Sequence, residues 1–124
     1  MLSEKFFECL DKDGIAAIAT ADEEGQVHLV NTWNKYIIVT EDEKILIPCA
    51  GFHKTERNVT NNPYVEMSIG SPEVMGRNYM GAGFHLTGTA EFYSDGPLFE
   101  RMHQERSFCS RVMVFTPETC RQMV

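Results

Sequence analysis

The stretch IAAIATADEEGQVHLVNTW, residues 15–33, contains two strand-like runs on either side of a polar turn. Residues 15–20 are small and apolar, whereas residues 27–33 alternate β-branched and aromatic side chains with polar ones. The intervening Glu23-Glu24-Gly25-Gln26 breaks the apolar pattern. This stretch therefore predicts a β-hairpin.

Further apolar runs extend the β-rich pattern towards the C-terminus. Five more strands are predicted, at residues 36–40, 44–48, 64–69, 84–93 and 111–115. The first two of these flank a polar turn and predict a second hairpin. Residues 70–83 contain four glycines and predict a long surface loop.

Three short helices are predicted around these strands. The first runs from Ser3, a good N-cap, to Asp13 and stops at Gly14. A second follows His53 and is closed by Asn-Asn-Pro, and a third begins at Pro97. Many short strands, glycine turns and few helices predict a mainly β, antiparallel barrel.

The composition limits the classes of protein to consider. The 124 residues are 43% hydrophobic and 23% charged, which is typical of one globular domain, here residues 1–124. The formal net charge of −7 disfavours binding to nucleic acid or anionic lipid. No apolar run approaches the ~20 residues that span a bilayer, and the first residues lack a leader pattern. We therefore expect a cytoplasmic protein without membrane contact.

Two common cofactor classes lack their sequence motifs. The four cysteines show neither C-x-x-C spacing nor the histidine pairing of zinc sites, so we expect reduced thiols and no bound metal. The glycine-rich residues 76–83 do not have the spacing G-x-G-x-x-G and do not open a helix after a strand. A resident dinucleotide is therefore not expected.

A candidate phosphate site lies in residues 48–55, where a strand ends in small residues and a helix begins at Lys54 and Thr55. Helix N–H groups, a lysine charge and a hydroxyl are the groups that hold a phosphate. The small Ala50 and Gly51 let a ligand approach the backbone. The alternative interpretation is an ordinary helix cap with a solvated lysine.

A second candidate site lies in residues 30–36, which place two asparagines, a threonine and the only tryptophan close together. Strand alternation sends Asn31 and Trp33 to one face and Thr32 and Asn34 to the other. Amides beside a large aromatic side chain suit a planar heterocycle. The alternative interpretation is a core tryptophan with turn-forming asparagines.

Three ordered motifs resemble the FMN-binding split-barrel family related to pyridoxamine 5'-phosphate oxidase, and most closely its small bacterial FMN-binding members. They are LVNTWN at 29–34, GFHKTERNV at 51–59 and GFHLTGTA at 83–90. The similarity runs nearly end to end. It implies a six-stranded antiparallel Greek-key split β-barrel with peripheral short helices, which forms a homodimer with FMN bound noncovalently near the subunit interface.

The resemblance also implies which residues of this sequence bind the cofactor. Lys54 and Thr55 are implied to hold the phosphate, and Val124 to reach the partner's flavin. The relatives carry a tryptophan at the position of Phe108. The implied set is Asn31, Thr32, Trp33, Asn34, Tyr36, Cys49, Ala50, Gly51, Lys54, Thr55, Phe108 and Val124. No side chain is expected to act as a catalytic acid or base, because the flavin supplies the chemistry.

The implied function is an FMN-binding flavoprotein that carries electrons between a donor and an acceptor that the sequence does not identify. The larger oxidases have a basic C-terminal extension that this chain lacks, so oxidation of a vitamin B6 phosphate is not expected. Two alternatives remain. One is an NAD(P)H-dependent flavin reductase, an oxidoreductase of the same fold, and the other is a ligand-binding barrel dimer without a redox role.

Overall fold

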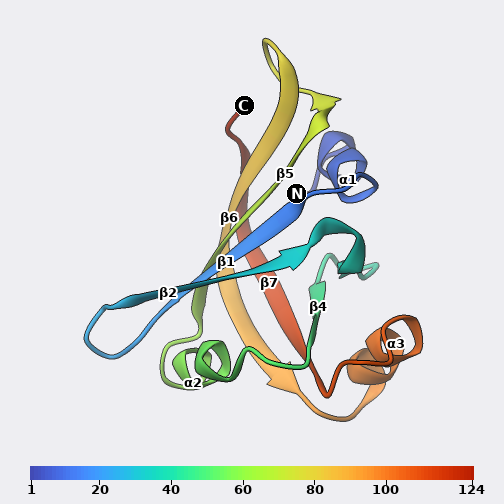
Figure 1. Ribbon diagram of the computed structural model, residues 1–124. Helices are drawn as coiled ribbons and strands as arrows, with labels where there is room; N and C mark the ends of the chain where they lie inside the picture. The colour runs from blue at the N-terminus through green and yellow to red at the C-terminus, as the bar shows by residue number, and fades with distance from the viewer.

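Seven strands form one antiparallel sheet in the computed structural model, which describes residues 1–124 (Figure 1). Across the sheet the order is β2-β1-β5-β6-β7-β4-β3, so the hairpins β1–β2 and β3–β4 lie at opposite edges. The strands are β1 (Ile15–Ala21), β2 (Val27–Trp33), β3 (Ile38–Val39), β4 (Ile45–Cys49), β5 (Tyr64–Met75), β6 (Met80–Tyr93) and β7 (Arg111–Gln122).

This sheet corrects the six-stranded barrel that the resemblance implies. There are seven strands, and the edge strands β2 and β3 do not pair with each other, so the sheet is open. β3 is only two residues long. Of the strand predicted at residues 36–40, Tyr36 ends the 3-10 helix η1 (Asn34–Tyr36), and only Ile38 and Val39 pair with β4. The mainly β, antiparallel character is confirmed.

The long loop predicted at residues 70–83 is wrong. β5 continues to Met75 and β6 begins at Met80, so a tight turn joins two long strands. β7 also runs past Phe115, where the predicted strand stops, and passes Pro117 at a shift in register opposite Gly88. A Cβ at Gly88 would lie 2.1 Å from the Thr116 carbonyl oxygen, so only glycine permits this close approach.

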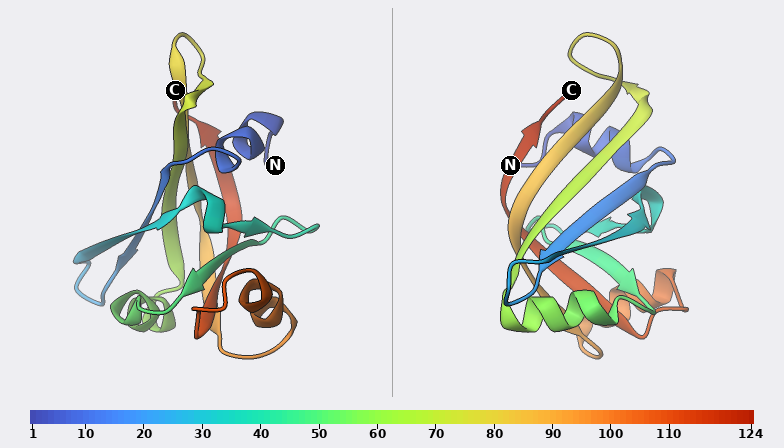
Figure 2. Two further views of the ribbon diagram at one scale, coloured as in Figure 1. Left: turned by 45° about the vertical axis from the view of Figure 1, so that its right-hand side comes forward. Right: turned by 60° about the vertical axis from the view of Figure 1, so that its left-hand side comes forward.

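The helices gather at the two ends of the sheet. α1 (Glu4–Leu10) packs on β5 and β6, and it ends before the predicted Asp13. Its N-cap is confirmed, since Ser3 Oγ accepts a hydrogen bond from the Phe6 N–H at 3.2 Å. α2 (His53–Asn61) and α3 (Pro97–Glu105) lie at the end opposite the β5–β6 turn and the C-terminus (Figures 1 and 2). None of the helices has the length and apolar character needed to cross a membrane.

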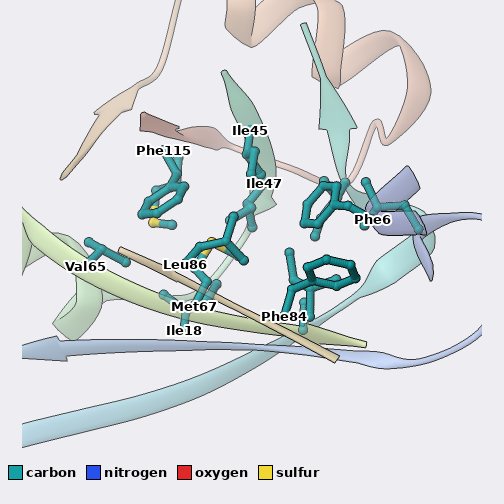
Figure 3. Packing of buried hydrophobic residues seen from close by; sticks show 14 of the residues in the cluster. Phe6, Ile18, Ile45, Ile47, Val65, Met67, Phe84, Leu86 and Phe115 are labelled. Atoms are coloured by element: carbon teal, nitrogen blue, oxygen red, sulfur yellow. The ribbon is translucent and has the colours of Figure 1, made fainter. Parts of the chain in front are cut away.

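Alternation along the strands places one face of the sheet in a single hydrophobic core (Figure 3). Ile18, Met67 and Leu86 stand side by side on β1, β5 and β6 and are fully buried. Phe6 of α1 closes this core by packing edge-on against Phe84, with ring centroids 5.6 Å apart. A smaller cluster beneath α3 contains Leu46, Met102, Cys109, Val112 and Val114.

Candidate cofactor site

Residues Cys49–Thr55, hereafter the corner, join the end of β4 to the start of α2. Phe52, the residue before α2, has φ 62° and ψ 32°, in the left-handed region. Residues other than glycine rarely adopt this conformation, and those that do concentrate at functional sites. Phe52 supplies no side-chain cap, so the first N–H groups of α2 remain available to a ligand.

Thr55 gives the corner a buried polar group that lacks a partner. The residue is fully buried, and its Oγ1 makes no hydrogen bond within the protein. A hydroxyl buried in this way costs about 1–3 kcal/mol. The neighbouring Lys54 is exposed and carries a positive charge. A helix N-terminus, a free hydroxyl and an ammonium group are groups that bind phosphate, so the corner is a candidate phosphate site.

Arg111 of β7 fixes the shape of the corner. Its guanidinium donates to the carbonyl oxygens of Gly51 at 2.6 Å and Ala50 at 3.2 Å. Its Nε donates to Glu56 Oε1 at 2.7 Å, which anchors the arginine to α2. Sequence reasoning missed this residue because no local motif marks it. Only the pairing of Cys49 with Arg111 across β4 and β7 brings it to the corner.

A hollow of about 200 Å³ lies next to the corner and joins it to the end of β2. It brings together seven of the twelve sequence-predicted site residues and adds Pro48 and Phe52, which were not predicted. The predicted residues that line it are Asn31, Thr32, Trp33, Tyr36, Ala50, Gly51 and Phe108. Drug-sized ligands occupy pockets of roughly 300–1,000 Å³, so this hollow holds only part of a cofactor.

Three aromatic side chains, Trp33, Tyr36 and Phe108, form one wall of the hollow, hereafter the aromatic wall. Tyr36 and Phe108 pack with ring centroids 5.6 Å apart and planes tilted by 50°. Trp33 and Phe108 are 53% and 51% exposed. Large apolar side chains left this open are typical of a surface that a ligand or another protein covers.

Asn34 does not line the hollow. β2 ends one residue earlier, and Asn34 begins η1 with its side chain turned into the protein. Its Nδ2 donates to the carbonyl oxygens of Cys9 at 3.1 Å and Gly70 at 2.7 Å. The strand alternation used in the prediction therefore stops at Trp33. Asn34 supports the end of β2 from inside.

Cys49 and Val124 also lie apart from the hollow. The Cys49 thiol is fully buried, and burial raises its pKa to about 12, so it is not a nucleophile. Its carbonyl oxygen accepts a hydrogen bond from the Ser110 N–H at 2.9 Å. Val124 lies at the far end of the sheet, in a larger hollow of about 610 Å³ with Tyr79, Met80 and Met123. Arg77 also lines that hollow.

Comparison with known proteins places the chain in a family. The model of the pyridoxamine 5'-phosphate oxidase family matches residues 2–124. The chain belongs to this family. A relative, the FMN-binding protein of Nitratidesulfovibrio vulgaris, is 50% identical over 100 residues, which are 81% of each chain.

Solved structures share the fold of this chain at low sequence identity. HupZ of Group A Streptococcus superposes with a TM-score of 0.81 at 19% identity, covering 99% of this chain and 94% of HupZ. An FMN-binding protein of Syntrophomonas wolfei gives a TM-score of 0.78 at 14% identity, covering 99% and 86% of the two chains. These likenesses show that the chain shares the fold of these solved structures.

Proposed function

We propose that this protein is an FMN-binding flavoprotein of the cytoplasm that acts as a homodimer and carries electrons. The observation that carries the proposal is the buried, unpartnered Thr55 hydroxyl at the start of α2, adjoining a hollow with an aromatic wall. The 50% identical relative, which is named an FMN-binding protein, supports the choice of FMN over other phosphorylated heterocycles.

The corner would hold the FMN phosphate. Lys54 supplies a positive charge, and the Thr55 hydroxyl supplies the hydrogen bond that the protein alone leaves unmade. The free N–H groups of α2 add to both. Arg111 keeps the Ala50 and Gly51 carbonyl oxygens turned towards itself. The corner is therefore already shaped for its ligand.

The hollow and its aromatic wall would hold the polyol chain and the ring. Asn31 and Thr32 offer an amide and a hydroxyl, while Trp33, Tyr36 and Phe108 shield a flat ring from water. FMN supplies one- and two-electron chemistry when bound. The residues of the chain bind it, orient it and limit the access of solvent, and no side chain transfers a proton in this proposal.

A second copy of the chain would complete the site. On the outer face of β1 and β2, Ile15, Val27 and Leu29 are more than half exposed beside Ala17 and Ala19. Small side chains beside exposed apolar ones form a hydrophobic surface of the kind that dimer interfaces bury. Trp33 lies on this same face and also lines the small hollow, so a partner subunit there would cover the ring. In this arrangement Val124 would act only on the partner's cofactor.

One observation favours the alternative function, an NAD(P)H-dependent flavin reductase. Half of the Trp33 and Phe108 surface is open in a single chain, which leaves room for a second reactant beside the ring. An NAD(P)H-dependent flavin reductase would use this opening. A redox carrier would use it to bring the ring edge near a protein donor or acceptor.

The first experiment is the visible spectrum of the purified protein, with mass analysis of any chromophore released by denaturation. The proposal expects flavin bands and FMN, at one molecule per chain of a dimer weighed by native mass spectrometry. Addition of NADH without air then separates the two redox functions. Bands that persist support the carrier, and rapid bleaching supports the reductase. A colourless protein that takes up no FMN would leave a ligand-binding barrel without a redox role.

A further inference from the structure

Two further hollows lie near the cofactor hollow, beginning beside Tyr36. A hollow of about 290 Å³ shares Trp33 and Tyr36 with the cofactor hollow. A third hollow, of about 520 Å³, shares Lys35 and Arg106 with the second one. The three hollows are therefore neighbours on the surface, and the third is lined by residues of α1 and β3. We call the second and third hollows together the side groove.

Arg106 is the cation at the middle of the side groove, and its side chain is held in place. Its guanidinium lies 4.4 Å from the centroid of the Tyr36 ring. Its Nη2 donates to the Lys35 carbonyl oxygen at 3.1 Å. Both contacts fix the plane of the guanidinium, which limits the loss of side-chain entropy when a ligand binds.

Arg106 differs from its neighbours in lacking a carboxylate partner. Arg101, on the helix α3 that ends just before Arg106, pairs with Glu41, and Arg111 pairs with Glu56. Only one of the five N–H donors of Arg106 has a protein acceptor. Free donors of a fixed guanidinium suit a carboxylate or a phosphate, which accept two parallel hydrogen bonds.

The surroundings of Arg106 define the rest of the ligand. Lys35 already pairs with Asp13 at 3.4 Å, and Asp11 also lines the groove, so the local charge is balanced. An inorganic anion therefore gains little electrostatic free energy by binding there. The far end of the groove is apolar and is lined by Phe7, Leu10, Ile37 and Val39. A ligand with both an anionic group and a flat apolar group matches this arrangement.

We propose that the side groove is a binding site for a small organic anion of the nucleoside phosphate type, with its phosphate on Arg106 and its flat group among the apolar side chains. This proposal goes beyond FMN binding and does not depend on it. The apolar hollow at the far end of the side groove shares no lining residue with the cofactor hollow.

The test is a calorimetric titration with ADP, adenosine and pyrophosphate. Excess FMN is present, so that the corner is filled. ADP is expected to bind at least ten times more tightly than adenosine or pyrophosphate, because it alone engages both parts of the groove. If the protein takes up no FMN, the same titrations are made on Lys54→Ala, in which the corner has lost its cation.

With FMN at saturating concentration, Arg106→Gln is expected to weaken ADP binding at least tenfold while the melting temperature stays unchanged. Arg106→Lys should recover only part of the affinity, because an ammonium lacks the planar pair of donors. Arg101→Gln, on the preceding helix α3 and facing Glu41, is the matched control and should bind ADP like the wild type. No binding of ADP at millimolar concentration, equal binding of adenosine, or an unaltered affinity in Arg106→Gln would each overturn the proposal.

Discussion

The corner and the aromatic wall are adjacent, yet they are held in different ways. The corner is fixed within one chain, because Arg111 ties Ala50 and Gly51 to Glu56 and leaves one buried hydroxyl free. The aromatic wall is half exposed and rests mainly on contacts between its own rings and Arg106. A single chain can therefore preform the phosphate site, whereas the ring site needs a cover.

The largest effect should come from removing that cover. Leu29→Glu places a charge on the outer face of β2, where Leu29 is 62% exposed in one chain and pairs with Ala19. Burying an unpaired charge in an interface costs several kcal/mol, so the dimer should dissociate at micromolar concentration. Sedimentation velocity measures the mass. FMN titration should show a larger loss of affinity than for any of the variants described below.

Gln104→Glu is the matched control for that substitution. Gln104 is exposed on α3, away from β1 and β2, so its variant should remain dimeric and bind FMN normally. If Leu29→Glu stays dimeric, the interface lies elsewhere. If it becomes monomeric and still binds FMN fully, the aromatic wall needs no cover, and the contrast between the two regions disappears.

Lys54→Ala removes the positive charge of the corner and tests whether the corner binds the FMN phosphate. A hydrogen bond to a charged group contributes about 1.5–3 kcal/mol, so the FMN dissociation constant should rise by roughly 10- to 150-fold. Riboflavin, which lacks the phosphate, should bind to the variant and the wild type alike. Equal FMN affinity in the two proteins would show that the corner does not bind the phosphate. Arg57→Ala, an exposed cation farther along the same helix, serves as the control.

Thr55→Val sharpens the comparison because it should act in opposite directions on the free and the loaded protein. Valine removes the buried hydroxyl that has no partner, so the FMN-free protein should gain about 1 kcal/mol of stability against urea. FMN should bind about tenfold more weakly, since the phosphate loses one donor. Thr60→Val, at an exposed position of the same helix, should show neither the gain nor the loss. A Thr55→Val protein less stable without FMN would show that the hydroxyl already has a partner.

Sequence patterns located the strands better than their ends. The 15–33 hairpin forms as predicted, because alternation and a polar turn are local signals. The predicted loop at 70–83 failed for a physical reason. A Cβ at Gly70 or Gly76 would lie within 2.6 Å of the backbone of the facing strand or turn. These glycines allow the backbones of a long hairpin to pack closely. A high glycine content is also typical of loops, so the sequence pattern of residues 70–83 was misread.

In the candidate site, too, residues close together in the sequence were predicted and residues distant in the sequence were missed. Asn31, Thr32 and Trp33 follow one another on β2, and the hollow brings them to Ala50 and Gly51 as the motifs indicated. Arg111 and Arg106 carry no local pattern, because each acts through residues about 60 or 70 positions away. Sequence reasoning on one chain therefore finds clustered motif residues, and it misses single arginines that fold back onto them.

The smallest predicted effect concerns Cys49, the fully buried residue where the corner begins. Burial raises the pKa of its thiol to about 12 from an ordinary value of 9.0. The folded protein therefore keeps the proton above pH 9 while the unfolded chain releases it, and stability falls as the pH rises from 9 towards 12. The loss from this group should reach about 1.4 kcal/mol for each pH unit. Urea unfolding at pH 8 and pH 10 of the wild type and Cys49→Ala measures it. The variant is less stable at both values because it leaves a cavity, but its loss between them should be smaller by about that amount. Equal losses would mean that Cys49 reaches solvent in the folded state and that the corner is as open as the aromatic wall.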